Sequence, residues 1–189
     1  MLEELKKSLE EAPIVKKGDY NYFVHPISDG IPLVEPKLLI EISECIADNL
    51  DLSKIDKIVA VESMGIHIAT ALSIHTGIPF LVIRKREYGL EGEKKVNQKT
   101  GYGSSNLYIN NLNEEDNILL VDDVISTGGT LKALIESLRG INVNIQDVVA
   151  VIEKGQGKDI VEKDLDLKIT TLVKMDVIDG KVVIESLNY

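Results

Sequence analysis

Two adjacent carboxylates lead into a turn of small polar residues. Residues 118–130 read ILLVDDVISTGGT, so Asp122 and Asp123 follow a nonpolar run and a helical pattern begins at the glycines. Backbone amides, hydroxyl groups and the N-terminus of that helix then converge on one small volume, which favours the binding of an anion such as a phosphate. The glycines let the backbone approach the anion closely. Carboxylates accept hydrogen bonds from hydroxyl groups and bind Mg²⁺ directly or through water.

A phosphate and two carboxylates repel each other, so one ligand must satisfy both groups. A sugar phosphate does so, because its phosphate fits the turn and its ring hydroxyls fit Asp122 and Asp123. Capping of the following helix would account for one of these carboxylates but not for two. The stretch therefore predicts a site for a phosphorylated sugar beside a buried strand.

The composition is that of a single globular domain of 189 residues. The net charge is −10, from 31 acidic and 21 basic residues, and it disfavours binding to nucleic acid or to an anionic membrane. No stretch approaches 18 uninterrupted apolar residues, and the N-terminus does not resemble a signal peptide. Cys45 is the single cysteine, which excludes an internal disulfide and fits a reducing compartment. We therefore expect a cytoplasmic protein without a membrane partner.

Strands and helices alternate from residue 57 onward. Nonpolar runs predict strands at 57–62, 79–84, 117–122, 147–154, 168–177 and 181–187. Apolar residues spaced by three and four predict helices at 2–12, 37–50, 63–77 and 129–140. Residues 14–34 read as a short hairpin or an irregular cap. This order predicts an α/β fold, in which helices cover both faces of a Rossmann-like, mainly parallel sheet.

Residues 85–105 interrupt the alternation. They read KREYGLEGEKKVNQKTGYGSS, with many charges and no apolar period. A loop of this length inside a compact domain is usually functional, although a solvated surface insertion has the same composition. The sequence therefore predicts a long loop here and leaves both interpretations open.

The stretch at 118–130 resembles the motif with which type I phosphoribosyltransferases bind phosphoribosyl pyrophosphate (PRPP). It differs from a P-loop and from a dinucleotide-binding glycine motif, and neither of those patterns occurs in the chain. Residues 60–73, AVESMGIHIATALS, resemble the pyrophosphate loop of that family, and residues 84–105 stand where it has a flexible catalytic loop. Residues 23–39, FVHPISDGIPLVEPKLL, and 150–159, AVIEKGQGKD, are similar to the archaeal-type hypoxanthine phosphoribosyltransferases.

This resemblance implies a single phosphoribosyltransferase domain over residues 1–189. Segments 1–35 and 155–189 would contribute a small hood and the base pocket, and residues 85–105 would be the flexible catalytic loop. The enzyme would transfer the 5-phosphoribosyl group of PRPP to hypoxanthine or guanine and release pyrophosphate, a reaction of purine salvage. Mg²⁺ would be the cofactor, and the family resemblance suggests a homodimer.

The resemblance also assigns roles to individual residues. Asp122 and Asp123 would hold the ribose hydroxyls and Mg²⁺, and together with Lys85 they would be the catalytic residues. The 5′-phosphate of PRPP would bind to Ile125, Ser126, Thr127, Gly128, Gly129 and Thr130. The pyrophosphate would bind to Glu62, Ser63, Met64, Gly65, Arg84 and Lys85. Closure of residues 86–105 would exclude water and bring Tyr102, Ser104 and Ser105 over the site.

Lys154 is the candidate for recognition of the purine base. A 6-oxo group needs a hydrogen-bond donor such as lysine, whereas the 6-amino group of adenine needs an acceptor. Lys154 matches the lysine that 6-oxopurine enzymes of the family place against O6, and the neighbouring Glu153 should point to the opposite side of the strand. Ser126 departs from the family pattern, because many 6-oxopurine enzymes have an aspartate there as proton acceptor. Water or Glu87 would have to take that role.

Two other functions fit part of the pattern. An adenine phosphoribosyltransferase would share the PRPP motif and differ in the base pocket. A PRPP-binding regulator without catalysis usually needs a DNA-binding module, for which residues 1–35 offer little room and few basic side chains. The charged loop also favours catalysis over sensing. His25, His67 and His75 do not form a metal-ligand pattern.

Overall fold

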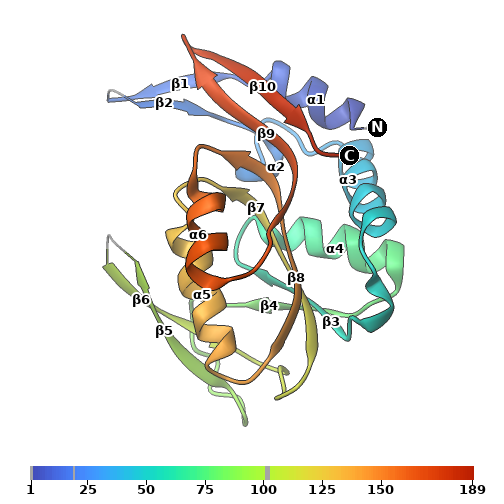
Figure 1. Ribbon diagram of the computed structural model, residues 1–189, viewed down its shortest axis with the longest axis vertical. Helices are drawn as coiled ribbons and strands as arrows, with labels where there is room; N and C mark the ends of the chain where they lie inside the picture. The colour runs from blue at the N-terminus through green and yellow to red at the C-terminus, as the bar shows by residue number, and fades with distance from the viewer. Residues whose placement is uncertain (1, 19, 101–102) are drawn as a thin grey trace.

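A six-stranded sheet forms the centre of the computed structural model, which describes residues 2–18, 20–100 and 103–189 (Figure 1). The strand order is β10-β9-β8-β7-β3-β4. Its strands are β3 (Lys57–Val61), β4 (Phe80–Ile83), β7 (Asn117–Ile125), β8 (Asn144–Lys154), β9 (Thr170–Ile178) and β10 (Lys181–Leu187). β10 runs antiparallel to β9, and the other neighbouring pairs are parallel. The predicted α/β fold with a mainly parallel sheet is confirmed.

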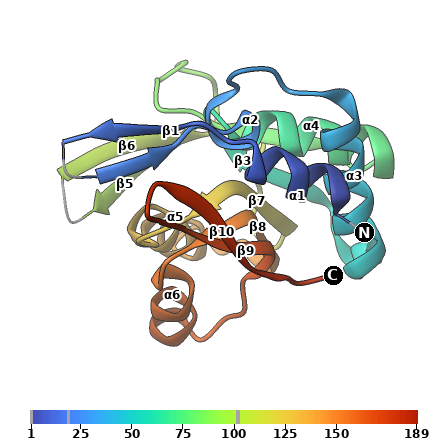
Figure 2. The ribbon, with the colours of Figure 1, turned by 90° about the horizontal axis from the view of Figure 1, so that it is seen from above.

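Helices cover both faces of this sheet (Figure 2). The helices α3 (Pro36–Asn49) and α4 (Gly65–Thr76) pack on one face, and α5 (Gly129–Arg139) and α6 (Gly157–Leu165) pack on the other. Successive strand residues alternate between two cores, so that Ile58 and Ala60 join the first core and Val59 joins the second. A strand with both faces buried therefore reads as a continuous nonpolar run.

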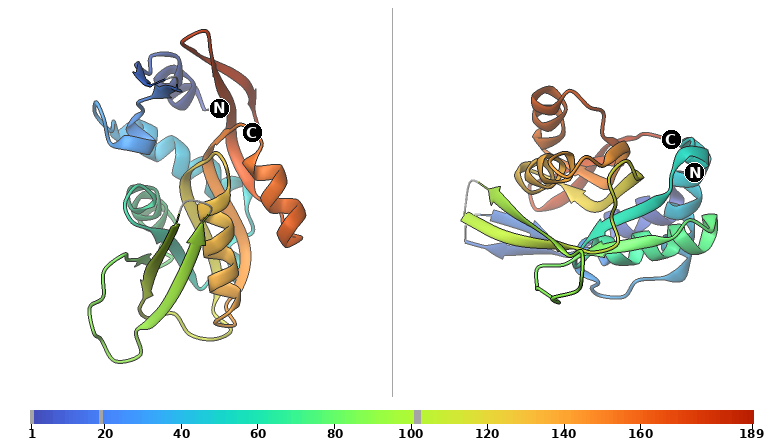
Figure 3. Two further views of the ribbon diagram at one scale, coloured as in Figure 1. Left: turned by 90° about the vertical axis from the view of Figure 1, so that its left-hand side faces the viewer. Right: turned by 90° about the horizontal axis from the view of Figure 1, so that it is seen from below.

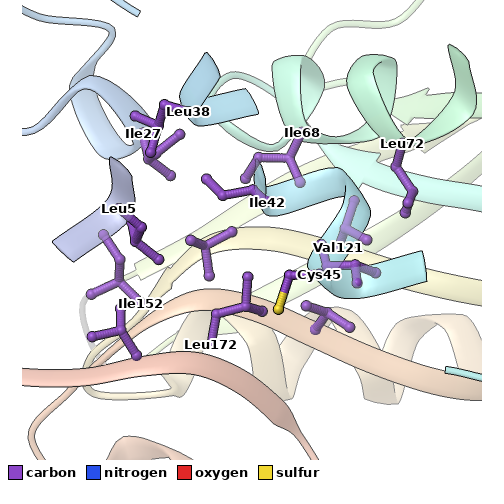
Figure 4. Close-up of a cluster of buried hydrophobic side chains, with 14 of the residues drawn as sticks. Leu5, Ile27, Leu38, Ile42, Cys45, Ile68, Leu72, Val121, Ile152 and Leu172 are labelled. Atoms are coloured by element: carbon purple, nitrogen blue, oxygen red, sulfur yellow. The ribbon is translucent and has the colours of Figure 1, made fainter. Parts of the chain in front are cut away.

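The core beneath α3 and α4 consists of aliphatic side chains and one cysteine (Figure 4). Ile42 and Cys45 of α3 lie near Ile68 and Leu72 of α4, with Val121 of β7 beneath them. Cys45 is buried, with 4% of its surface exposed. This packing fixes α4 against β7, and with it the turn that precedes α4.

The N-terminal segment packs against the β9–β10 hairpin, which forms the antiparallel edge of the sheet, and we call this region the hood (Figure 1). Its N-terminal part comprises α1 (Glu3–Glu10), β1 (Ile14–Lys17), β2 (Tyr20–Phe23) and α2 (Pro26–Asp29). Leu2, Leu5 and Leu9 are fully buried, so the predicted apolar face of α1 is confirmed. The Glu41 carboxylate accepts hydrogen bonds from the backbone amides of Glu4 (3.1 Å) and Leu5 (2.9 Å). It thereby satisfies amides that the first turn of a helix leaves without partners.

A buried histidine fixes the hood internally. The Nδ1 atom of His25 accepts a hydrogen bond from the Ile27 amide at 3.2 Å, so the ring proton belongs on Nε2, which lies 2.9 Å from the Ser8 hydroxyl. Burial disfavours the charged ring and lowers the pKa of His25 from 6.5 to about 4, although the carboxylate of Asp29 opposes this shift. His25 is therefore neutral in the folded protein near neutral pH.

We expect His25 to make the protein less stable in acid. Between pH 6.5 and about pH 4 the unfolded chain binds a proton at this ring that the folded chain does not, so stability is lost as the pH falls. The loss in the free energy of unfolding reaches about 3 kcal/mol at most. Thermal unfolding of wild type and of His25→Asn, measured across this pH range, tests the expectation. Asparagine keeps a cap acceptor but does not titrate, so equally steep declines in the two proteins would contradict it.

The structure differs from the sequence-based prediction in a strand, a helix and a loop. The strand predicted at 117–122 continues through both aspartates to Ile125, because it keeps pairing with β8 as far as Glu153. Helix α6 lies where no helix was predicted, since Gly157 and Val161 are its only buried residues. The predicted loop at 85–105 contains the strand β5 (Lys94–Thr100), which pairs with β6 (Gly103–Ile109).

The β5–β6 hairpin lies at the opposite end of the molecule from the hood (Figure 3). It packs against α5, with Val96 beside the second core. The structure holds one further short element, a 3₁₀ turn at Leu52–Lys54. None of the helices in the described ranges is long and apolar enough to cross a membrane.

Candidate active site

A pocket of about 520 Å³ opens at the carboxyl ends of β3 and β7. Its lining comes from the turn after β3, the segment after β4, the end of β7 and the first turns of α5: Val61, Glu62, Ser63, Met64, Lys85, Asp122, Asp123, Val124, Thr130 and Leu134. Carboxyl ends of parallel strands are where open α/β sheets bind ligands. Val61 and Leu134, which are 73 residues apart in sequence, thus meet in one cavity.

Asp122 and Asp123 lie on β7 where it extends beyond β3. The last β3–β7 pair is Ala60 with Val121, so the two carboxylates stand where the neighbouring strand ends and the pocket begins. Burial and the charge of Asp122 raise the pKa of Asp123 to about 9. Burial also raises the pKa of Asp122, although Lys85 opposes this shift. Without a ligand Asp123 therefore keeps its proton near neutral pH, and a bound cation would favour its ionised form.

The turn after β7 is tightly packed. Gly128 has a φ of 76°, a left-handed conformation that glycine adopts without strain, and α5 begins at Gly129. Thr130 lines the pocket with the aspartates, and Ser126 and Thr127 are exposed. Ile125 is 2% exposed and packs into the second core, so only its backbone is open to a ligand. The predicted phosphate turn thus lies beside the two carboxylates.

This turn also contacts the start of α6. A Cβ atom built on Gly157 would lie 2.0 Å from the carbonyl oxygen of Ser126, and one on Gly128 would lie 2.7 Å from the carbonyl oxygen of Gly157. Two glycines are therefore needed at this contact, because any side chain would strike backbone atoms. The segment that follows Lys154 is in this way locked against the predicted phosphate turn.

The predicted pyrophosphate loop forms the facing wall of the pocket. Glu62, Ser63 and Met64 line it, and Gly65 begins α4. The Glu62 carboxylate accepts a hydrogen bond from the backbone amide of Lys85 and lies 3.0 Å from the Arg84 guanidinium. Lys85 lines the pocket, but Arg84 is paired with Glu62 and is not among the lining residues. The structure therefore brings five of the six predicted pyrophosphate residues to the pocket or its edge and ties Arg84 to one of them.

Lys154 lies apart from this pocket, at the end of β8. It is 8% exposed, and its Nζ lies 5.5 Å from the centroid of the Phe23 ring, a cation–π contact. Glu153 contacts Lys158 and Lys174 instead, consistent with opposite orientations for neighbouring strand residues. Sequence reasoning missed Phe23. Its one signal was its place in the segment 23–39, which gave no hint of a contact with β8.

The family model described as a phosphoribosyl transferase domain matches residues 33–182 of this chain. The chain belongs to the phosphoribosyltransferase family. A hypoxanthine/guanine phosphoribosyltransferase of Methanobrevibacter ruminantium is 65% identical over 187 residues, which cover 99% of this chain and 100% of that protein. One of Methanothermus fervidus is 59% identical over 182 residues, which cover 96% of each chain. The predicted family is confirmed.

Solved structures with this fold include adenine phosphoribosyltransferases. The enzyme of Thermoanaerobacter pseudethanolicus superimposes with a TM-score of 0.72 at 25% identity, over 92% of this chain and 99% of its own. The enzyme of Saccharomyces cerevisiae, complexed with adenine and an imino-altritol bisphosphate, gives a TM-score of 0.69 at 25% identity, over 89% and 96%. The α/β architecture is therefore that of known phosphoribosyltransferases.

In the segment predicted as the catalytic loop of this phosphoribosyltransferase, Glu93 makes several hydrogen bonds to neighbouring residues. The Glu93 carboxylate accepts hydrogen bonds from the amides of Tyr88 (3.1 Å) and Gly89 (2.8 Å), and from the side chain of Asn110 at 2.8 Å. Glu87, the alternative proton acceptor, is exposed. Tyr102 lies outside the described residues, and so do the side chains of Ser104 and Ser105. A role for this loop in catalysis stays a prediction.

The pocket fits a divalent cation that shares its ligands with substrate. Within residues 2–18, 20–100 and 103–189, no group of three or more His, Cys, Asp and Glu side chains is placed to enclose a metal ion. Asp122 and Asp123 do form a partly buried carboxylate pair with raised pKa values, so a positive charge there would be stabilising. Mg²⁺ keeps several waters and binds through one or two carboxylates plus substrate phosphates, which matches this donor set.

Proposed function

We propose that this phosphoribosyltransferase transfers the 5-phosphoribosyl group of PRPP to hypoxanthine or guanine, giving IMP or GMP and pyrophosphate in purine salvage. One observation carries the proposal: two adjacent, partly buried carboxylates, a glycine–threonine turn and the Glu62–Met64 turn meet around one pocket. Relatives named hypoxanthine/guanine phosphoribosyltransferase, 51% to 65% identical over nearly the whole chain, support the choice of base.

In the proposed reaction the bond between C1 of the ribose and the pyrophosphate oxygen breaks. A purine ring nitrogen bonds to C1 with inversion and loses its proton to water or to Glu87. Asp122 and Asp123 hold the ribose hydroxyls, and their charge favours the positive ring that develops in the transition state. The turn at 126–130 binds the 5′-phosphate through backbone amides and hydroxyls. Lys85 and the Glu62–Gly65 turn hold the departing pyrophosphate.

Mg²⁺ belongs to this proposal as the cofactor. Asp122 and Asp123 are the residues that would hold it, directly or through water, since no other acidic side chain lines the pocket on that side. When bound, Mg²⁺ supplies positive charge that neutralises the pyrophosphate. The chain's own residues orient the ribose and keep water from the reacting carbon.

The test is a PRPP-dependent assay with hypoxanthine, guanine, adenine and xanthine measured side by side. Turnover of hypoxanthine or guanine above adenine is the expected result. Preference for adenine would instead support the second candidate, an adenine phosphoribosyltransferase, whose fold this chain shares. PRPP binding in calorimetry without turnover of any base would support a regulator.

Lys154 is expected to decide between these bases. Lys154→Ala removes the donor for a 6-oxo group, so kcat/KM for hypoxanthine should fall about 10²-fold, whereas activity with adenine, which offers no acceptor at C6, should change little. Steady-state kinetics with both bases measure the ratio. Equal losses with hypoxanthine and adenine would remove Lys154 from base recognition.

The proposal further includes a homodimer and a cytoplasmic location. An apolar groove of about 700 Å³ lies between α3 and α4, lined in part by Leu39, Ile40, Ile66 and Ile74, and Ile74 is 81% exposed. A second copy of the chain would cover this surface, which also reaches Ser63 of the pyrophosphate turn. Light scattering should give twice the chain mass of 20.9 kDa. PRPP and free purines are metabolites of the cell interior, which is the reason for the location.

A further inference from the structure

Glu153 is a buried carboxylate outside the pocket. It is 4% exposed, and its Oε2 accepts a hydrogen bond from the Thr171 hydroxyl at 2.9 Å. Two ammonium groups compensate its charge: Lys158 Nζ lies 3.4 Å from Oε2, and Lys174 Nζ lies 3.4 Å from Oε1. Burying a carboxylate is costly unless it is paired and hydrogen-bonded, and this one is both.

The partners of Glu153 come from two other elements, and a third segment joins them through Thr171. Lys158 belongs to the first turn of α6, and Thr171 and Lys174 belong to β9. Near the C-terminus, the Asn188 side chain donates hydrogen bonds to the backbone oxygen and the hydroxyl of Thr171, at 2.8 and 3.0 Å. We call Glu153, Lys158, Thr171, Lys174 and Asn188 the Glu153 cluster. It joins the end of β8 to α6, β9 and the C-terminal residues.

The Glu153 cluster is linked both to the phosphate turn and to Lys154, the candidate base-binding residue. Glu153 pairs across the sheet with Ile125, the residue directly before the phosphate turn, and this is the last β7–β8 pair. Lys154 therefore extends beyond β7 and pairs in the sheet with Met175 of β9. On the other side, Lys158 follows Gly157, which packs against Ser126 of the phosphate turn.

We propose that Glu153 is a positioning residue for base recognition. By holding Lys158 and Lys174 it fixes the end of β8 and the first turn of α6, and it thereby fixes the direction in which Lys154 leaves the sheet. This inference rests on the proposed function, since it acts through the role of Lys154. Loss of the carboxylate charge leaves Lys158 with the Thr171 hydroxyl at 3.4 Å and Lys174 with the Glu185 carboxylate at 3.7 Å. These side chains are 21% and 34% exposed, so both can then turn away from the end of β8.

The test substitution is Glu153→Gln, which keeps the side-chain shape and an acceptor for the Thr171 hydroxyl but removes the charge. We expect KM for hypoxanthine to rise roughly tenfold with kcat within about threefold, because contacts to the base act on the ground state and the transition state alike. KM for PRPP should rise less. A merely structural role would lower the thermal midpoint and leave KM for hypoxanthine unchanged, and that result would overturn the proposal.

A double-mutant cycle decides whether Glu153 acts through Lys154. In a Lys154→Ala background, Glu153→Gln should no longer change KM for hypoxanthine, whereas equal effects in both backgrounds would refute the coupling. The matched control is Asp164→Asn, which removes the carboxylate that pairs with Lys132 at 2.6 Å at the far end of α6. Its KM for hypoxanthine should equal that of wild type. A wild-type protein inactive with all four bases would instead be a failure of the proposed function.

Discussion

Asparagine at both position 122 and position 123 should abolish transferase activity and leave the fold intact. The amides fill the same space, but they carry no charge to favour the positive ribose ring or to hold Mg²⁺. Removal of a single preorganised electrostatic group in an active site typically costs on the order of 10² to 10³ in kcat, so the double variant should lose at least about 10³-fold. The PRPP-dependent assay measures the loss, and circular dichroism verifies the fold.

The same substitutions should stabilise the ligand-free protein. The folded pKa of Asp123, about 9, lies above its ordinary value of 3.8, so the folded state holds a proton that the unfolded state releases between these pH values. Stability from this group is complete below about pH 4 and is lost as the pH rises toward 9. Asp123→Asn removes this dependence. We expect its thermal midpoint at about pH 8 to exceed that of wild type by several degrees, since 1 kcal/mol corresponds to about 2–4 °C at this chain length.

Two outcomes would contradict this account of the aspartates. Activity near wild type in the double variant would remove both residues from the site. A gain in stability of the same size at pH 4 and at pH 8 would mean that the gain does not come from ionisation. Glu114→Gln serves as a control for carboxylate-to-amide exchange, because Glu114 is exposed and precedes β7 at the end of that strand opposite the aspartates. It should change neither activity nor this pH dependence.

The sequence predicted the sheet and the centre of the site for a physical reason. Residues 58–61 and 118–121 are nonpolar on both sides because helices cover both faces, and such runs are unambiguous. Asp122 and Asp123 stood out because ionisable residues seldom interrupt such a run. The Gly128–Thr130 turn was recognisable from its small residues, since its conformation depends on local backbone geometry.

Other features were beyond the sequence because they depend on contacts between distant segments. The strand β7 continues through Asp122 and Asp123 only because β8 keeps pairing with it. The strand β5 is mostly polar, and its one apolar side chain among the described residues, Val96, packs against α5. Ile160 of α6 is 51% exposed, which weakened the apolar period of that helix. No spacing in the chain relates Phe23 to Lys154.

The contact between Gly157 and the phosphate turn also joins distant segments of the chain. Its disruption should have a large effect on activity. In Gly157→Ala the new methyl group would lie 2.0 Å from the Ser126 oxygen, 2.5 Å from the Thr127 carbonyl carbon and 2.6 Å from the Gly128 nitrogen. All three atoms belong to the backbone, so no side-chain rotation relieves the clash. Either α6 withdraws or the turn moves.

We expect Gly157→Ala to lower the free energy of unfolding by about 1–3 kcal/mol, the usual cost of overpacking. The larger effect should be on PRPP, because a displacement of about 1 Å in a binding group can cost on the order of 10²-fold in rate. The expected result is a fall of that size in kcat/KM for PRPP, measured below the melting temperature of the variant. Calorimetric binding of PRPP with Mg²⁺ reports the same weakening without turnover.

Gly140→Ala is the matched control for this substitution. Gly140 follows α5 with an ordinary φ of −64°, and its added methyl group would meet only carbonyl oxygens at 3.3 and 3.5 Å. Replacing glycine by alanine at such a position restricts the unfolded chain and does not touch the pocket, so kcat/KM for PRPP should equal that of wild type. If Gly157→Ala destabilised the fold and yet bound PRPP as wild type does, the packing of α6 would be a matter of stability alone. The phosphate turn would then hold its shape without α6.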